Sequence, residues 1–233
     1  MGDNGLSHED FFKVFHTGGG FTSGCGSMFE LNLRCGGGDG ADIYVVEYQQ
    51  SSVVEKTPVK ALDNSLNPDF GLLRSGRRLI NIPLRRFSDD VPCELHDVLP
   101  ATGHYVVLVL LPKLFRDPRV QQQLEYLMIG ILQKFVSGIM EPFVIHPLRS
   151  NDDVEWSMFP KALKEGWEWN LFGDVSGQGY ETLGVDRDAG VVAVLRPDGV
   201  LGGVWDLDEL APKHRVENYL AVNLSAPGIK LFP

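Results

Sequence analysis

Residues 191–205 read VVAVLRPDGVLGGVW, two apolar runs joined by the four residues RPDG. Pro197 fixes φ at about −65° for the first corner of a turn. Asp198 suits the second corner, and Gly199 leaves the turn without a steric penalty from a Cβ atom. The stretch therefore predicts a β-hairpin, in which Arg196 has no role in the turn chemistry. Both arms are almost wholly apolar, which predicts a sheet covered on both faces.

The charge balance limits the classes of partner. The chain has 233 residues, with 21 Lys and Arg against 31 Asp and Glu and a formal net charge of −10. Nucleic-acid binding needs a basic surface that releases counterions from phosphates, so this balance argues against it. The longest apolar run, Tyr105–Pro112, is far shorter than the roughly 20 residues that span a bilayer. The start MGDNGLSHEDFF has neither a basic nor an apolar signal region, so we expect a cytoplasmic protein without a membrane segment.

The cysteines and histidines form no metal or redox pattern. Cys25, Cys35 and Cys93 contain no CxxC pair, and an odd number at irregular spacing is not a secreted disulfide framework. The six histidines are scattered along the chain. A pair such as His96 and Asp97 on a short helical turn is more often solvated than bound to a metal. The sequence therefore predicts reduced thiols and no metal site.

The amino-terminal part of the chain is rich in glycine. Ser7 precedes the apolar run 11–15, which predicts a short helix that Ser7 caps and the following glycines end. Two glycine-rich stretches then lead to residues 42–50, which predict a strand. We expect an amino-terminal extension over residues 1–20 and a single domain over residues 21–233.

The next part of the chain is predicted to be largely irregular. Residues 49–70 are polar and contain two prolines, which predicts a long surface connection. Residues 87–90 predict a turn, and Glu94–Leu99 predict one short helical turn. Arginines concentrate in this region, and we expect them to pair with acidic side chains of the same protein. These arginines are Arg77, Arg78, Arg85 and Arg86.

Residues 104–148 predict a β-α-β unit. The run 105–111 predicts a buried strand, and Asp117 and Pro118 are the expected N-cap and first residue of the clearest helix in the chain. Apolar residues then recur every three or four positions, which is one face of a helix. Phe143 begins the next predicted strand. The two strands should therefore be parallel and joined by a right-handed crossover.

The remaining segments complete the order of elements. Residues 158–164 predict a short helix, and the aromatic stretch 167–172 predicts the end of a strand. After the hairpin, residues 207–224 predict a closing helix interrupted early by Pro212. The order β-α-β, connection, β-hairpin, α is the thioredoxin arrangement. The expected fold class is therefore α/β and thioredoxin-like, with a mixed central sheet, helices on both faces and an amino-terminal extension.

Three segments together carry a family resemblance. They are FTSGCG at 21–26, GRRL at 76–79 followed by PLRRFSDDVPCELHDVLPATGHYVVLVL at 83–110, and the segment from Tyr180 that contains GVDRDAGVVAVLRPDGVLGGVWDLDEL. They resemble the C-terminal domain of fungal phenol 2-monooxygenase and related FAD-dependent aromatic hydroxylases, and the likeness runs from about Phe21 to Leu224. The resemblance implies a thioredoxin-like fold used for subunit contact rather than thiol chemistry.

The sequence agrees that thiol chemistry is absent. A thioredoxin-type redox motif would follow the first buried strand, where residues 112–118 read PKLFRDP without a cysteine. The resembling enzymes place this domain after an FAD domain and a substrate domain, and neither fits into the 20 residues before Phe21. The chain also has no dinucleotide fingerprint. We therefore expect a free-standing domain without a cofactor, which is not a flavin monooxygenase by itself.

Two functions are compatible with these observations. The first is a dimerisation or interaction module, either a homodimer or the partner of a separate flavin monooxygenase, accessory to aromatic or polyketide secondary metabolism. The second is a cofactor-free isomerase, cyclase or dehydratase that binds an aromatic or polyketide-like ligand in an apolar pocket. Candidate catalytic residues for the second are His104, His146, Tyr180, Arg196 and Asp198, with Trp169 as a pocket wall. His146 at a strand end and Asp198 in the turn also have structural explanations.

Overall fold

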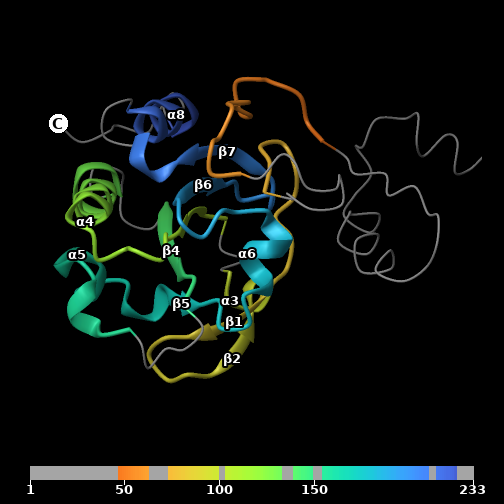
Figure 1. Ribbon diagram of the computed structural model, residues 1–233. Coiled ribbons are helices and arrows are strands. Elements are labelled where there is room, and N and C mark those ends of the chain that lie inside the picture. The colour runs from red at the N-terminus through yellow and green to blue at the C-terminus, as the bar shows by residue number, and fades with distance from the viewer. Residues whose placement is uncertain are drawn as a thin grey trace, which may run out of the picture. The chain divides into compact units, whose positions relative to one another are not determined.

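The computed structural model describes residues 47–62, 73–99, 103–132, 139–148, 154–209 and 214–224 (Figure 1). All of them belong to one compact unit, Glu47–Pro233. The helix predicted after Ser7, the glycine-rich stretches and the start of the strand predicted at 42–50 lie outside the described residues. The domain boundary between residues 20 and 21 stays a prediction.

A mixed sheet of seven strands forms the centre of this unit, in the order β2-β1-β5-β4-β3-β6-β7. The strands are β1 (Pro83–Arg86), β2 (Pro92–Glu94), β3 (Tyr105–Leu110), β4 (Met140–His146), β5 (Leu171–Gly173), β6 (Val191–Leu195) and β7 (Leu201–Asp206). The helices are α3 (Leu95–Val98), α4 (Pro118–Glu125), the π-helix η2 (Tyr126–Ile131), α5 (Lys161–Lys164), α6 (Gln178–Leu183) and α8 (Arg215–Leu224), with single 3-10 turns η5 (Trp156–Met158), η6 (Glu168–Asn170) and η7 (Leu207–Glu209).

The element order and strand directions are those of a thioredoxin-like fold. Strands β3 and β4 are parallel and are joined through α4 and η2, as the sequence predicts. Strand β6 pairs antiparallel with β3 on one side and with β7 on the other, and α8 follows the hairpin. Four neighbouring strands, β4-β3-β6-β7, thus carry the arrangement, and the predicted α/β class is confirmed.

The hairpin predicted at 191–205 is confirmed. Gly199 has φ +79°, and its N–H donates to the carbonyl of Arg196 at 2.9 Å. Every residue of both arms is buried, in agreement with their apolar composition. The pairing also contains a β-bulge that was not predicted: Leu195 pairs with Leu201, whereas Val194 pairs with Gly203, so Gly202 is the extra residue.

Helix α4 begins as its sequence predicts. The Asp117 carboxylate accepts a hydrogen bond from the N–H of Arg119 at 2.8 Å, and Pro118 takes the first helical position, where no N–H is needed. From Tyr126 the helix continues with π-type hydrogen bonds as η2. Its buried residues pack on the sheet.

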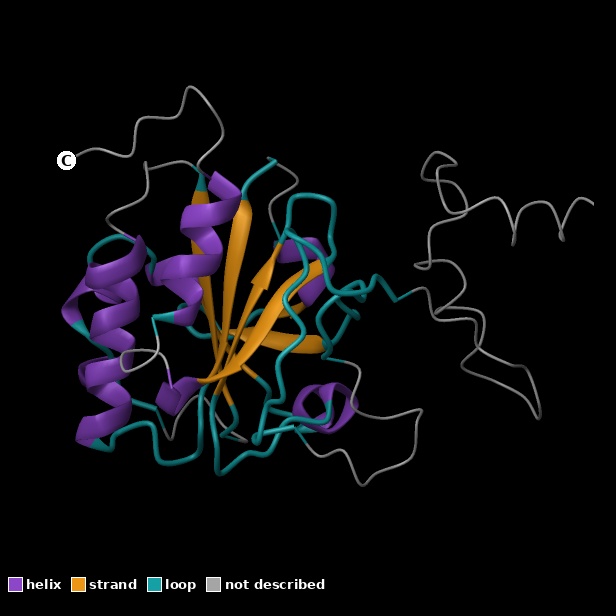
Figure 2. Ribbon diagram, turned by 90° about the horizontal axis from the view of Figure 1, so that it is seen from above, coloured by secondary structure: helices purple, strands orange, loops and turns teal. Residues whose placement is uncertain are grey.

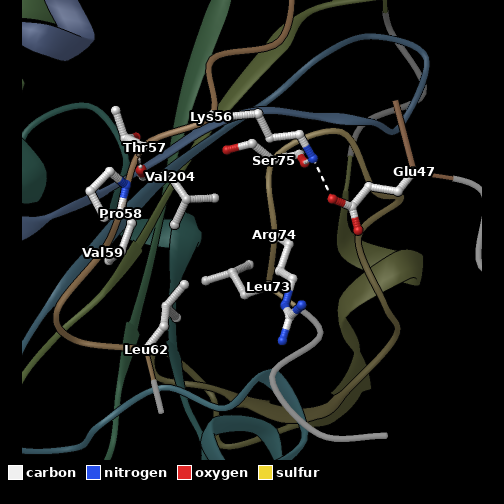
Figure 3. A pocket seen from close by; sticks show the side chains of 10 residues that line it. All are labelled: Glu47, Lys56, Thr57, Pro58, Val59, Leu62, Leu73, Arg74, Ser75 and Val204. Atoms are coloured by element: carbon white, nitrogen blue, oxygen red, sulfur yellow. Dashed lines mark hydrogen bonds and ion pairs between the residues drawn. The ribbon is translucent and has the colours of Figure 1, made fainter. Parts of the chain in front are cut away.

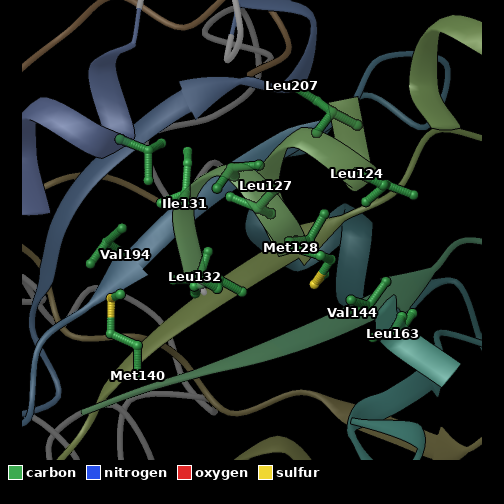
Figure 4. Close-up of a cluster of buried hydrophobic side chains, with 14 of the residues drawn as sticks. Leu124, Leu127, Met128, Ile131, Leu132, Met140, Val144, Leu163, Val194 and Leu207 are labelled. Carbon is green, nitrogen blue, oxygen red and sulfur yellow. The ribbon is translucent and has the colours of Figure 1, made fainter. Parts of the chain in front are cut away.

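Two apolar clusters lie on the two faces of the sheet, and Figure 2 shows the strands between helices on both sides. One cluster joins the strands to α4, η2, α5 and α8, and includes Leu127, Met128 and Ile131 of η2 (Figure 4). The other joins them to α3 and α6, through Leu95 and Leu183. Full burial of one such side chain stabilises a protein by about 1.5–3 kcal/mol, so each face holds its helices firmly.

Strand β4 begins at Met140 and includes Pro142, whereas the sequence predicts that this strand begins at Phe143. The carbonyl of His146 accepts from the N–H of Asp174, so even-numbered residues of β4 direct their backbone groups toward β5. The pairing of β4 with β5 begins only at Val144. The nitrogen of Pro142 faces the side of β4 where β5 has not yet begun, so no strand accepts a hydrogen bond there. Proline is tolerated in a sheet at such positions.

Two other segments differ from their predictions. Glu47–Gln50, the described end of the strand predicted at 42–50, has no regular structure, since the N–H of Tyr48 reaches the carbonyl of Gly76 without a continuing ladder. Strands β1 and β2 were not predicted, although the turn between them at 87–90 was. The described part of the 49–70 connection contains only isolated bridges, as expected.

Candidate functional site

The structure divides the five candidate catalytic residues between two ends of the sheet. His104 precedes β3, and its Nδ1 lies 3.0 Å from Oε1 of Glu141. Arg196 follows β6 at the same end, because Val106 pairs with Leu195. Tyr180 contacts the opposite end, where β3 and β4 finish. Six residues of β3 separate the two ends, about 20 Å at the rise of a strand, so the five side chains share no small-molecule site.

Arg196 and Asp198 are used inside the hairpin turn. Nη2 of Arg196 lies 2.6 Å from Oδ2 of Asp198, and Oδ1 of Asp198 accepts the N–H of Val200 at 3.2 Å. The arginine thus neutralises the aspartate that shapes the turn. This pairing accounts for Arg196, which the turn chemistry alone left unexplained.

Tyr180 satisfies backbone carbonyls in the core. It is fully buried on α6, and its hydroxyl lies 2.7 Å from the carbonyl oxygen of Leu111 and 2.9 Å from that of Ile145, to which it donates. Burial, with the Asp174 carboxylate nearby, raises the pKa of Tyr180 well above its usual value. The phenol therefore stays protonated and serves as a structural donor.

His146 ends β4 in an aromatic cluster. It is fully buried, and its ring lies 6.3 Å from the ring of Phe87 and 6.5 Å from that of Phe115. Phe115 stacks on Phe159 at 5.5 Å. Trp169, the predicted pocket wall, lies instead on η6 with 60% of its surface exposed.

The described surface includes the following three hollows. The first holds about 310 Å³ and is drawn in Figure 3; its lining residues are Glu47, Lys56, Thr57, Pro58, Val59, Leu62, Leu73, Arg74, Ser75 and Val204. Two others, of about 550 and 360 Å³, lie beside the amino-terminal turn of α4. None of the five candidate residues lines any of the three.

The hollow in Figure 3 is closed on one side by an ion-pair network. The Glu47 carboxylate accepts hydrogen bonds from Nζ of Lys56 and from Nε of Arg77. Burial alone would raise the pKa of Glu47, but these two bonds outweigh it and hold the pKa below its usual value. The charge of Glu47 is thus balanced by Lys56 and Arg77 within the protein. These ion pairs stabilise the 47–62 segment and are not arranged around a ligand.

The outer edge of β7 is covered by the chain itself. The N–H of Glu55 donates to the carbonyl of Gly202 at 2.7 Å, and that of Gly76 donates to Leu201 at 2.6 Å. Leu201 in turn donates to the carbonyl of Arg77 at 2.8 Å. An exposed edge invites pairing with another sheet, and here the connection occupies those groups.

Three of the arginines that were predicted to pair with acidic side chains of the same protein form such pairs. Arg77 pairs with Glu47, and in the β1–β2 turn Arg85 pairs with Asp90 at 2.9 Å. A matching pair, Arg86 and Asp89, lies 3.1 Å apart in the same turn. Three of the four arginines of this stretch are therefore paired within the protein.

Redox and metal chemistry find no support among the described residues. The described cysteine, Cys93, lies on β2, away from residues 112–118, and burial raises the pKa of its thiol, which disfavours the reactive thiolate. Within the described ranges no group of three or more His, Cys, Asp or Glu is placed to hold a metal ion. No helix in those ranges is long and apolar enough to cross a membrane.

Residues 46–227 match the family model of the phenol hydroxylase C-terminal dimerisation domain. The chain belongs to this family. The match agrees with the resemblance carried by the hairpin and by residues 83–110, and it covers every residue that the structure describes.

Relatives of this dimerisation-domain chain include two oxygenases of Aspergillus. The flavin-dependent oxygenase ucdD of Aspergillus ustus is 29% identical over 147 residues, which cover 58% of this chain and 22% of the relative. The phenol 2-monooxygenase fsqG of Aspergillus fumigatus is 23% identical over 221 residues, which cover 88% of this chain and 33% of the relative. The matched part is thus a third or less of each relative's length.

Solved structures similar to the dimerisation-domain chain include two kinds of protein. Aklavinone-11 hydroxylase in complex with FAD and aklavinone aligns with 79% of this chain and 27% of its own, at 17% identity and a TM-score of 0.43. A thiol peroxidase from Chromobacterium violaceum aligns with 67% of this chain and 94% of its own, at 14% identity and a TM-score of 0.46.

One set of surface residues escaped the sequence prediction. Leu114, Trp156 and Trp169 are among the exposed large apolar side chains, at 76%, 37% and 60%. Hydropathy places such residues in a core, so their exposure could not be predicted. The sequence offers only their clustering: three of the four tryptophans of the chain fall between residues 156 and 169.

Proposed function

We propose that this domain is an association module, which pairs with a second copy of itself or with a separate flavin monooxygenase. The observation that carries the proposal is the match of residues 46–227 to a family described as a C-terminal dimerisation domain. The module would need no cofactor of its own, and its partner would supply the chemistry.

The use of polar side chains supports a structural role. Tyr180 donates its hydrogen bond to backbone carbonyls, and Arg196 and Asp198 bond to each other and to the backbone of the hairpin turn. His104 is paired with Glu141. A catalytic site instead needs such groups to converge on one cavity. The cofactor-free isomerase, cyclase or dehydratase is therefore the weaker proposal, since its candidate residues lie at two ends of the sheet.

The names of the relatives suggest the kind of metabolism in which this domain acts. Two relatives are named a flavin-dependent oxygenase and a phenol 2-monooxygenase, both from Aspergillus. By analogy, we propose a role beside an oxygenase of aromatic or polyketide secondary metabolism in the cytoplasm. Any ligand of the assembly would then bind to the oxygenase partner.

Sedimentation velocity over a wide range of protein concentration tests the proposal. We expect a concentration-dependent dimer, or a complex when a flavin monooxygenase from the same organism is added. Specific, stable interfaces typically bury about 1,200–2,000 Å² in total, and their affinity is measured from the concentration dependence. A chain that stays monomeric at every concentration and binds no such oxygenase would contradict the proposed function.

A further inference from the structure

We propose that Ser88 is a phosphorylation site, at which a protein kinase that selects basic substrates transfers the terminal phosphoryl group of a nucleoside triphosphate to the serine hydroxyl. Ser88 lies in the turn that joins β1 to β2. The inference goes beyond the proposed function, because it requires neither a second copy of the chain nor an oxygenase partner.

The charges around Ser88 are the first argument. Residues 85–90 read RRFSDD, so Arg86 and Arg85 stand two and three positions before the serine. Ser88 is the only serine or threonine in the sequence with arginine at both positions. Protein kinases select substrates by the pattern of charges beside the hydroxyl group, and arginine forms paired hydrogen bonds with the carboxylates of an acidic cleft. The pattern therefore indicates a kinase that prefers basic substrates.

The Ser88 side chain is exposed and its hydroxyl has no structural role. Within the described residues this hydroxyl makes no hydrogen bond. The hydroxyls of two other serines are used by the fold, since that of Ser157 donates to Glu155 at 3.0 Å and that of Ser176 donates to Asp174 at 3.2 Å. Phosphorylation of Ser88 therefore removes no hydrogen bond that its hydroxyl makes in the fold.

The two arginines lie over the turn that carries Ser88. Nη1 of Arg85 lies 2.9 Å from both Oδ2 and the carbonyl oxygen of Asp90. Nη1 of Arg86 lies 3.1 Å from Oδ2 of Asp89. The arginine side chains are 39% and 30% exposed, and ion pairs at such exposure contribute little to stability. A kinase therefore takes over both guanidinium groups at small energetic cost.

The hairpin that carries the turn can open locally. The hydroxyl must enter the kinase cleft beside the phosphoryl donor, which requires the turn to open. Strand β2 is at the edge of the sheet and has three residues, which pair with β1. The N–H of Arg86 closes the turn by donating to the carbonyl of Val91 at 3.0 Å. Short exposed pairings open at a much lower free energy than the whole domain, so the core stays folded.

The kinase and its nucleotide supply the rest of the reaction. The Ser88 oxygen forms a bond to the γ-phosphorus, and the bond from this phosphorus to the β–γ bridging oxygen breaks. The nucleoside diphosphate leaves, and the hydroxyl proton passes to the catalytic carboxylate of the kinase. This chain contributes the acceptor oxygen and the arginines that position it.

The phosphate changes the balance of charge in the turn. Phosphoserine carries a charge of about −1.5 to −2 at pH 7 and has three acceptor oxygens. Together with Asp89 and Asp90 it competes for the two arginines, so the existing ion pairs weaken. Asp90 has φ +55°, and the bond from Arg85 to its carbonyl weakens with them. We expect the turn between β1 and β2 to loosen.

Trp156 reports this change. Phe87, which directly precedes Ser88, stacks on the ring of Trp156 with 5.5 Å between the ring centres and 10° between the planes. A looser turn moves the Phe87 ring away from the indole. Phosphorylation should therefore change the tryptophan fluorescence of the natural chain but not that of Trp156→Phe. An equal change in both proteins would overturn the expected loosening.

The test incubates the whole chain with ATP and a purified protein kinase that selects arginine at these two positions. We expect a single phosphate, which tandem mass spectrometry places on Ser88, and no phosphate on Ser88→Ala. Ser157→Ala is the matched control, because Ser157 is also exposed but follows no arginine, and this variant should be modified like the natural chain. Phosphate on other residues and none on Ser88 would overturn the inference.

Replacement of the arginines tests recognition. Arg85→Gln and Arg86→Gln should each slow the phosphorylation of Ser88 about tenfold or more, because each loses a charged hydrogen bond to the kinase. Arg119→Gln is the control, since Arg119 is exposed on α4, and its rate should stay within about twofold. The same substitutions in a peptide of residues 83–94 measure recognition where no turn has to open. Equal rates for the natural and the substituted sequences would contradict the role of the arginines.

The remaining measurements concern the folded chain and its own cells. If the peptide is modified and the folded chain is not, the turn is closed to kinases and the inference is overturned. Phosphopeptide mapping of the chain isolated from the cells that produce it should find phosphate on Ser88, and its absence under all growth conditions would also overturn the inference. None of these results depends on dimerisation, so they leave the proposed function unaffected.

Discussion

The hydroxyl of Tyr219 occupies the space that a side chain on Gly202 would need. A Cβ atom on Gly202 would lie 1.8 Å from Oη of Tyr219. The hydroxyl donates to the carbonyl of Val53 at 2.9 Å. The bulge in the β6–β7 hairpin thus lets α8 hold the segment that covers the β7 edge.

We expect Gly202→Ala to destabilise the domain by about 1–3 kcal/mol, because the new methyl group must displace Tyr219 or the strand. Equilibrium unfolding in urea measures the loss. Gly166→Ala is the control, since its nearest contact would be 4.0 Å away, and it should change the free energy of unfolding by less than about 0.5 kcal/mol. Equal effects of the two substitutions would disprove the close contact.

Tyr219→Phe removes the hydrogen bond to Val53 without changing the ring. We expect a loss of about 1 kcal/mol. Residues 47–62 should also exchange their amide hydrogens faster, because the hydroxyl is one of the bonds that holds them. Unchanged exchange throughout that segment would show that the bond does not hold it.

Stability should fall as the pH rises above about 10, the usual pKa of tyrosine. Burial raises the pKa of Tyr219 and of Tyr180 in the folded protein. Above pH 10 the unfolded chain loses these phenolic protons while the folded chain keeps them, so the folded state becomes less favoured. Urea unfolding at pH 8 to 11 should show a shallower decline for Tyr219→Phe than for the natural chain. Parallel declines would contradict the assignment.

Asp174→Ala should destabilise the domain by about 2 kcal/mol or more. Asp174 is fully buried and accepts the N–H groups of Gly179 at 3.2 Å and Tyr180 at 2.8 Å, which open α6. Asp188→Ala is the matched control, because that exposed carboxylate only pairs with Lys113 at 3.2 Å, and its loss should be below about 1 kcal/mol. Thermal unfolding distinguishes the two, and a similar loss for both would contradict the role of Asp174.

Sequence alone determined the elements whose cause is local. The turn chemistry of Pro197 and Gly199 predicts the hairpin, and Asp117 with Pro118 predicts the start of α4. The run of apolar residues in both hairpin arms predicts a sheet covered on both faces. From these elements and their order, the thioredoxin-like arrangement follows, because few topologies connect a β-α-β unit to a hairpin.

Tertiary structure decided everything that depends on residues far apart in the chain. Pro142 enters a strand because β5 does not reach it. Tyr219 bonds a carbonyl 166 residues away, and Tyr180 uses its hydroxyl on two strand ends. The exposure of Trp169 depends in the same way on which surfaces the other elements cover. Local sequence sets the conformation of a segment, whereas burial and partners depend on how all segments pack. That packing uses most of the candidate residues in holding the fold together and leaves Trp156 and Trp169 on the surface.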